Sequence, residues 1–236
     1  SDYYQELVNG LVERTAFPVI TSSISINGNG SIFDYAPDIL RTNPMRFFLT
    51  LPGSSLTLND LTFQNGKLIQ LAEGIVVKSE GDLFIHRTIF RNNGLNRAGR
   101  TTISHSNGGL LISDSLFERN HESYGSAVVR VDAARIARIE RSTFYLNDPT
   151  YDILEFTNTP LDIVNSTFVE NHGTVIASYG EETVTVDQST FVDNLFAFAN
   201  ADVSDIHVMN SIFGSHFSIC DWYSNDDIQS KGYNIL

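Results

Sequence analysis

Apolar and polar positions follow one pattern that recurs seven times along the chain. Each repeat has a short alternation of apolar and polar residues, then a polar corner, then a phenylalanine. The seven phenylalanines are Phe63, Phe90, Phe117, Phe144, Phe168, Phe191 and Phe213. The residues seven and five positions before each of them are apolar in every repeat, whereas the residues beside those positions are mixed. This period-two alternation predicts short strands with one buried face.

The spacing of the phenylalanines predicts the architecture. Successive intervals are 27, 27, 27, 24, 23 and 22 residues, and no helical periodicity lies between the strands. We therefore expect each strand to pair with the equivalent strand one repeat further on. The predicted fold is all-β, a right-handed parallel β-helix of about eight coils whose rungs lie about 4.8 Å apart.

Two polar columns mark the corners of the coil. The residue three positions before each phenylalanine is one that suits a bend between strands: Asp60, Arg87, Asp114, Arg141, Asn165, Gln188 and Asn210. Three residues after the phenylalanine, five successive repeats carry asparagine: Asn93, Asn120, Asn147, Asn171 and Asn194. We expect these asparagines to accept left-handed backbone angles and to form a hydrogen-bonded ladder, and the phenylalanines to form an interior stack.

The ends of the chain depart from the repeat. Residues Asp2 to Glu13 place several apolar side chains near one helical face, which predicts a short amphipathic helix that caps the first coil. The predicted organisation is a single domain over residues 1–236, with an N-terminal cap at 1–20, coils at 21–215 and a C-terminal cap or tail at 216–236.

Composition and charge exclude several classes of partner. Fifteen Lys and Arg against 28 Asp and Glu give a net charge of -13, so nucleic acid and anionic membrane are unfavourable partners. No apolar run reaches the about eighteen residues needed to span a bilayer, and we expect no membrane insertion by this fragment. The single cysteine, Cys220, excludes an internal disulfide framework and a zinc site built from cysteines.

Several stretches resemble a known group of exported proteins. ITSSISINGNGSIF followed by FFLTLPGSSLTLNDLTFQNG resembles the amino-terminal part of bacterial CSLREA-domain proteins, and SICDWYSNDDIQSKGYNIL is similar to the end of their choice-of-anchor segment. The Phe-x-x-Asn repeats also resemble those of polymorphic outer-membrane adhesins. The resemblance implies a pectin-lyase-like solenoid at the cell surface or outside the cell, a fold that hosts adhesins, lyases and hydrolases alike.

One group of outward residues is the candidate for catalysis. Arg138, Glu140, Asp162 and Asp187 lie on neighbouring repeats, with Glu140 and Asp187 in one column two rungs apart. That spacing places their backbones about 9 to 10 Å apart, near the upper end of the carboxylate separation in inverting glycosidases. The alternative interpretation is a salt bridge between Arg138 and Asp162, with solvated acids elsewhere.

A second group is the candidate for ligand binding. His121, Asp148 and His172 each stand four residues after their phenylalanine on three successive repeats, where a general base or a metal ligand is conceivable and a polar surface edge is the alternative. We predict no metal site and no cofactor. Calcium is considered only at the acidic pairs Glu181–Glu182, Asp202 with Asp205, and Asp226–Asp227, none of which has the spacing of a known calcium loop.

Three classes of function remain open. The first is a non-catalytic adhesin or binding scaffold for an extended ligand, such as a polysaccharide or another cell's surface, because repeated rungs can meet repeated units. The second is a polysaccharide lyase or glycoside hydrolase that uses Glu140 and Asp187. The third is a structural stalk, whose mark is a surface without an exposed aromatic patch.

Overall fold

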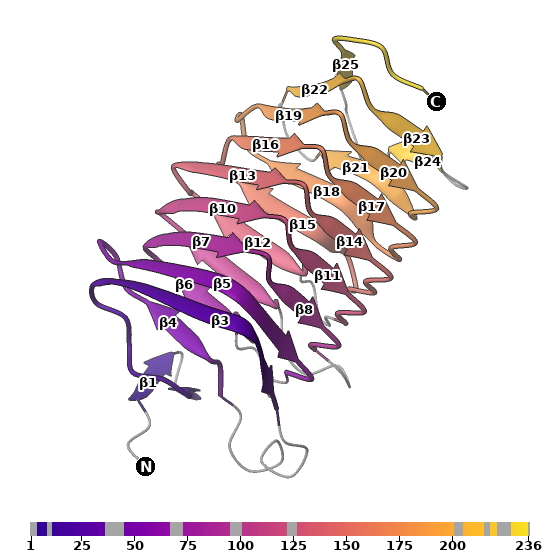
Figure 1. Ribbon diagram of the computed structural model, residues 1–236. Coiled ribbons are helices and arrows are strands. Elements are labelled where there is room, and N and C mark those ends of the chain that lie inside the picture. The colour runs from indigo at the N-terminus through magenta and orange to yellow at the C-terminus, as the bar shows by residue number, and fades with distance from the viewer. Residues whose placement is uncertain are drawn as a thin grey trace.

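The chain forms a solenoid of parallel strands in a computed structural model (Figure 1). The structure describes residues 4–8, 11–35, 45–66, 73–94, 101–121, 127–200, 205–214, 218–220 and 228–235. The large sheet has 15 strands. They are β3 (Ser23–Asp34), β5 (Ser55–Gln64), β7 (Asp82–His86), β8 (Ile89–Arg91), β10 (Gly109–Ser113), β11 (Leu116–Glu118), β13 (Ile136–Glu140), β14 (Thr143–Tyr145), β16 (Leu161–Val164), β17 (Thr167–Val169), β19 (Val184–Asp187), β20 (Thr190–Val192), β22 (Ile206–Met209), β23 (Ile212–Gly214) and β25 (Ile228–Ser230).

A second sheet of eight strands lies behind the large one in Figure 1. Its strands are β4 (Phe48–Thr50), β6 (Val77–Ser79), β9 (Ile103–Ser106), β12 (Val129–Asp132), β15 (Asp152–Thr157), β18 (Thr174–Tyr179), β21 (Phe196–Asn200) and β24 (Ser218–Cys220). We call β7, β10, β13, β16, β19, β22 and β25 the first stack, and β8, β11, β14, β17, β20 and β23 the second stack. The eight-stranded sheet is the third stack.

Each regular coil takes one strand from each stack. Six such coils follow one another, from β7–β8–β9 to β22–β23–β24, so the solenoid has about six turns. The predicted eight coils are not supported. The two strands that precede the regular coils, β3 and β5, are long single strands in the large sheet. A shift of the pairing register between Asn27 and Ser31 makes β3 irregular.

The predicted helix over Asp2 to Glu13 is wrong. These residues contain two strands, β1 (Tyr4–Val8) and β2 (Leu11–Thr15), which pair antiparallel with Val8 opposite Leu11. Asn9 and Gly10 stand between them in the sequence, and Asn-Gly is the strongest short signal for a β-hairpin. The cap over the first coil is not supported either, although one backbone bridge joins Thr15 of β2 to Arg46.

The core follows the repeat. The apolar residues five and seven positions before each phenylalanine are at most 3% exposed. From Phe63 to Phe213 the phenylalanine rings stack with centroids 4.6 to 5.5 Å apart, which confirms the interior stack. Because offset aromatic pairs add to the free energy gained by burial, this column stabilises the length of the solenoid.

The asparagine ladder is confirmed in its hydrogen bonds. Asn147, for example, donates from Nδ2 to Asn171 Oδ1 at 3.0 Å and to the Phe117 carbonyl at 2.9 Å, and its own Oδ1 accepts from Asn120. The prediction of left-handed backbone angles on these asparagines is wrong by one residue. The positive φ angles belong to the residues directly before them: Asn92, Arg119, Leu146, Glu170 and Asp193. The corner residues three positions before each phenylalanine, from Asp60 to Asn210, all have positive φ, which produces the bend between the first and second stacks.

One histidine lies inside the coil and gives the fold a pH dependence. His105 on β9 is 2% exposed, its Nε2 faces the Gly108 carbonyl at 3.2 Å, and its Nδ1 has no hydrogen-bond partner within the described residues. Burial lowers the pKa of His105 below its usual value of about 6.5. The unfolded chain therefore binds this proton at a higher pH than the folded chain does. As a result, the free energy of unfolding decreases as the pH falls below about 6.5.

We expect His105→Leu to remove part of this acid sensitivity. Between pH 7 and pH 5 the wild-type melting temperature should fall by more than that of the variant, because the unfolded wild type binds this proton more tightly than the folded protein does. Thermal melts across the pH range measure the difference. Parallel pH profiles for the two proteins would contradict a neutral, buried His105.

Candidate functional site

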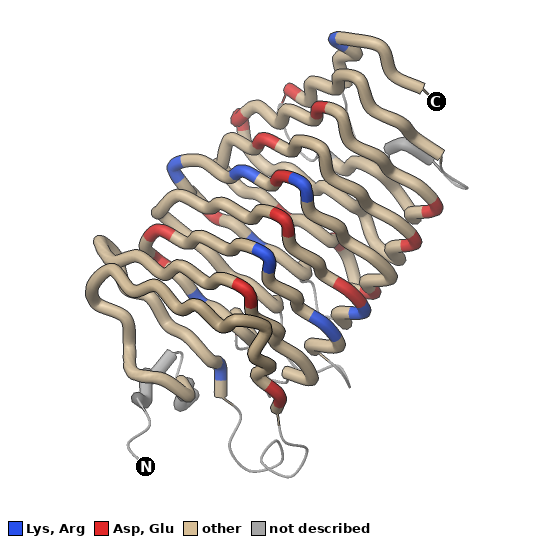
Figure 2. Tube along the Cα trace, viewed as in Figure 1, with Lys and Arg blue, Asp and Glu red and all other residues tan. Residues whose placement is uncertain are grey.

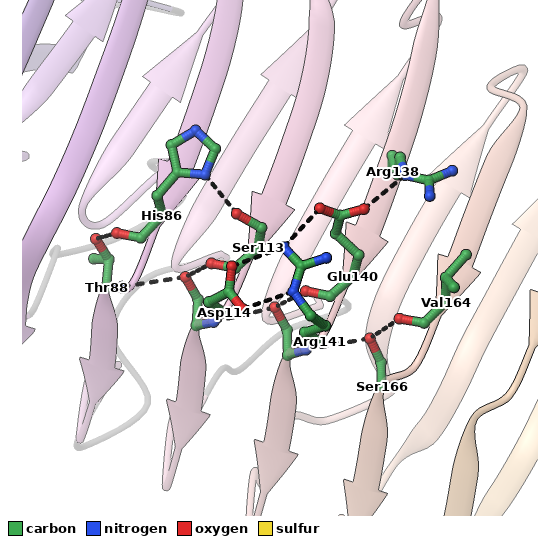
Figure 3. A network of polar contacts seen from close by, with 11 residues as sticks. His86, Thr88, Ser113, Asp114, Arg138, Glu140, Arg141, Val164 and Ser166 are labelled. Carbon is green, nitrogen blue, oxygen red and sulfur yellow. Dashed lines mark hydrogen bonds and ion pairs between the residues drawn. The ribbon is translucent and has the colours of Figure 1, made fainter.

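Two arginine side chains contact Glu140 of the predicted catalytic group on the outer face of the first stack (Figure 3). Arg138 Nε donates to Glu140 Oε2 at 3.0 Å, and Arg138 Nη1 lies 3.6 Å from Asp162 Oδ2 on the next coil. Arg141 Nη2 contacts the other oxygen, Glu140 Oε1, at 2.9 Å. The salt bridge between Arg138 and Asp162, expected as the alternative interpretation, is therefore present.

Electrostatics set the charge of Glu140. The hydrogen bond from Arg138 is the main cause that lowers the pKa of Glu140, and Arg141 adds to it. A carboxylate held ionised in this way is a poor proton donor for glycosidic cleavage, which needs a general acid with a raised pKa. Asp187 lies in the same column as Glu140, two coils away as predicted, with Val164 between the two residues. Asp187 accepts a hydrogen bond from Asn210 Nδ2 at 3.0 Å. The structure does not link the two carboxylates.

Two further ion pairs run along the corner between the first and second stacks. Arg87 donates to both oxygens of Asp60 at 2.7 and 2.8 Å, and Arg141 donates to both oxygens of Asp114 at 2.8 Å. The hydrogen bonds from these arginines lower the pKa of Asp60 and of Asp114. Each arginine spans one rung, so these bidentate pairs connect adjacent coils at the exposed corner.

The sequence patterns did not reveal a close contact between His86 and Ser113. His86 Nδ1 lies 2.5 Å from Ser113 Oγ on the next coil of the first stack (Figure 3). A nucleophile and a base need this proximity, and they also need access to a substrate. Ser113 is 2% exposed, so the contact serves the packing of two adjacent coils.

The histidine group is brought together as the repeat predicts, with the aspartate in the middle. His121 Nδ1 lies 3.4 Å from one Asp148 oxygen, and His172 Nδ1 lies 3.7 Å from the other. Within the described residues no group of three or more His, Cys, Asp and Glu side chains is arranged to hold a metal ion. A role of these three residues in binding stays a prediction.

A cluster on the third stack was missed by the sequence reasoning. Arg130 on β12 contacts Glu73 at 3.1 Å and Glu155 on β15 at 3.3 Å, and Ser104 on β9 donates to Glu73 at 3.3 Å. Glu155 is 13% exposed, and burial is the main cause that raises its pKa. The signal was absent because the phenylalanine frame aligns the first two stacks and leaves the third stack unaligned.

The outer face of the first stack also carries apolar side chains. Phe84 on β7 and Leu111 on β10 are half-buried, point away from the core and lie in register on adjacent strands. Thr57 precedes them in this column and Arg138 follows them. Thr57, Asn59, Phe84, His86, Leu111 and Arg138 together form what we call the platform.

The calcium candidates are only partly covered by the structure. Glu181 and Glu182 are exposed, as is Asp205. Asp202, Asp226 and Asp227 lie outside the described residues. Among the residues that are described, no helix has the length and apolar character to cross a membrane.

Comparison with protein families decides the classification. Residues 48–213, which run from β4 to β23, match the model described as a right handed beta helix region. The chain belongs to the right-handed β-helix family. This membership confirms the predicted handedness and the solenoid fold. No curated protein and no solved structure matches this β-helix, and the finer resemblance to CSLREA-type and polymorphic outer-membrane proteins stays a prediction.

Proposed function

We propose that this β-helix is a non-catalytic binding scaffold for an extended ligand such as a polysaccharide, and that it acts outside the cell or at the cell surface. The observation that carries the proposal is the platform, where outward side chains of successive coils stand in register. A ligand with repeating units can meet side chains placed about every 4.8 Å along the stack.

The chemistry of the platform favours a neutral polymer. Phe84 and Leu111 offer apolar contact area, and Asn59 and His86 lie in the neighbouring column with polar groups. The arginine beside them, Arg138, is already paired with Glu140 and Asp162. An anionic polymer therefore gains little from this arginine, while a sugar ring can lie on the aromatic side chain and form hydrogen bonds at its edges.

Replacement of the aromatic side chain tests this proposal. We expect Phe84→Ala to weaken retention of the protein on its preferred neutral polysaccharide about tenfold, the effect of losing one aromatic contact of about 1.4 kcal/mol. Affinity gel electrophoresis across a polysaccharide panel measures the retention. Tyr151→Ala is the control, because Tyr151 is 59% exposed and lies off the platform. If the wild type, Phe84→Ala and Tyr151→Ala were retained equally on every polymer, the platform would not be the binding surface.

One observation favours the second candidate function, a polysaccharide lyase or glycoside hydrolase. Glu155 is a carboxyl with a raised pKa that faces Glu73 across Arg130. Paired carboxyls in unlike environments are the usual acid and base of glycoside cleavage. The scaffold proposal is preferred because two arginines hold Glu140, the candidate drawn from the repeat, in its ionised form, which is a poor proton donor. The third candidate, a structural stalk, is less favoured because Phe84 and Tyr145 both point outward from the coil.

A further inference from the structure

Charge is divided unequally along the solenoid. Residues 1–141 contain 14 acidic and 14 basic residues, whereas residues 142–236 contain 14 acidic residues and one basic residue, Lys231. The net charge of -13 therefore belongs entirely to the second part of the chain. Figure 2 shows the change: blue segments are frequent up to the coil of β13, and beyond it one blue segment remains, near the C-terminal end. We call residues 142–236 the acidic half.

The acidic half also has an uncharged face. The outward positions of β14, β17 and β20 in the second stack are Thr143, Tyr145, Thr167, Val169, Thr190 and Val192. All six side chains are half-buried, and they stand in register on three successive coils. We call these six residues the strip. Its hydroxyl, aromatic and β-branched side chains give a flat surface on which apolar groups can pack.

Carboxylates border the strip on both sides. Glu170 and Asp193 directly follow Val169 and Val192 at the outer corner, and the positive φ of each fixes its backbone there. On the other side, Asp162 and Asp187 point outward from the first-stack strands of the same two coils. Asp162 contacts Arg138. Asp187 accepts a hydrogen bond from Asn210, and beside the first coil of the strip the corner residue Arg141 is paired with Asp114 and Glu140. The net charge beside β17 and β20 is negative, which disfavours an anionic partner.

We propose that the strip and its bordering carboxylates bind a basic polypeptide segment that lies across the second stack. The aliphatic stems of Lys and Arg pack on surfaces such as Tyr145, Val169 and Val192 while their charged ends reach surrounding carboxylates. This arrangement, an uncharged centre with a rim of one sign, fits a partner of opposite charge and speeds its association. A small cation would use the carboxylates alone and leave the strip uncovered.

This binding surface is separate from the platform. The platform lies on β5, β7, β10 and β13, in the part of the chain whose charges balance, whereas the strip lies on β14, β17 and β20. The proposal therefore goes beyond the scaffold function proposed above. Loss of one binding activity leaves the other intact, so the two proposals fail separately.

Binding of a defined peptide tests the proposal. The probe is a short fluorescein-labelled peptide of alternating Lys and Val, and fluorescence anisotropy follows its titration with the whole chain. A peptide of alternating Glu and Val is the charge-reversed control. We expect the Lys peptide to bind, the Glu peptide not to bind, and the affinity to fall in about 0.5 M salt because the ions screen the contacts.

A matched pair of double variants locates the surface. Glu170→Gln with Asp193→Asn removes two charges at the strip, and Glu181→Gln with Glu182→Gln removes two charges from exposed residues between β18 and β19 in the same half. We expect about tenfold weaker binding for the first variant and less than about twofold for the second, since charge pairs at a rim act locally. Circular dichroism verifies that both variants fold. Equal losses, no binding of the Lys peptide, or binding of the Glu peptide would each overturn the proposal.

Discussion

Asn147→Ala is expected to lower the free energy of unfolding by about 4 kcal/mol, because the substitution leaves several buried polar groups without partners. Asn147 is fully buried, and its side-chain amide forms hydrogen bonds with the Asn171 side chain, the Phe117 carbonyl and the Asn120 side chain. Its Oδ1 also accepts the Asn120 backbone N–H at 3.1 Å. Alanine can replace none of these contacts, and the neighbouring coils hold the orphaned groups in place. Urea unfolding followed by circular dichroism measures the change.

Asn59→Ala is the control for this prediction. Asn59 is half-buried on the outer face, and its closest side-chain hydrogen bond, to Asn27 at 2.8 Å, is exposed. We expect a loss of less than about 1 kcal/mol, since water can satisfy the groups that remain. If the two variants were destabilised equally, the ladder would have no special part in the stability of the solenoid.

Phe144→Ala is expected to have an effect of similar size, about 4 kcal/mol, by a different cause. The Phe144 ring is fully buried between Phe117 and Phe168, with centroids 4.6 and 5.0 Å away. Truncation opens a cavity in the middle of the stack, and the rings on either side are fixed by their own coils and cannot close it. The same urea experiment measures the loss.

The matched control is Phe84→Ala, which removes the same atoms from the outer face. Phe84 is half-buried, so we expect it to lose less than half as much stability as Phe144→Ala. A smaller effect for Phe144→Ala than for Phe84→Ala would mean that the interior stack does not hold the coils together.

The large sheet was predictable from the sequence because its two stacks carry fixed residue types. The phenylalanines, the apolar pairs before them and the asparagines after them must each occupy one place in every coil, so their spacing reveals the repeat. The third stack also has an apolar inward column, but its distance from the preceding phenylalanine falls from 14 to 7 residues along the chain, so the phenylalanine spacing does not reveal it. The column is Val77, Ile103, Val129, Leu154, Ile176 and Phe198. Apolar spacing alone predicts a helix at the N-terminus, whereas Asn9 and Gly10 favour the hairpin that the structure contains.

The candidate site was predictable only where it follows the same frame. Equal distance from the phenylalanines placed Arg138 beside Asp162, and Asp148 between His121 and His172, as the structure has them. The second arginine on Glu140, Arg141, comes from the corner column, whose pattern predicts a bend in the backbone but not the partners of its side chains. The cluster of Glu73, Arg130 and Glu155 joins residues 57 positions apart at its widest contact, which no local pattern reports.

The central claim, that this β-helix binds its ligand without cleaving it, is tested most directly by incubation with a panel of neutral and acidic polysaccharides. New reducing ends and unsaturated products are followed while retention on each polymer is measured. We predict retention on a neutral polymer that depends on Phe84, with no product from any member of the panel. Product release that Glu140→Gln, Asp187→Asn or Glu155→Gln abolishes would contradict the account and identify an enzyme.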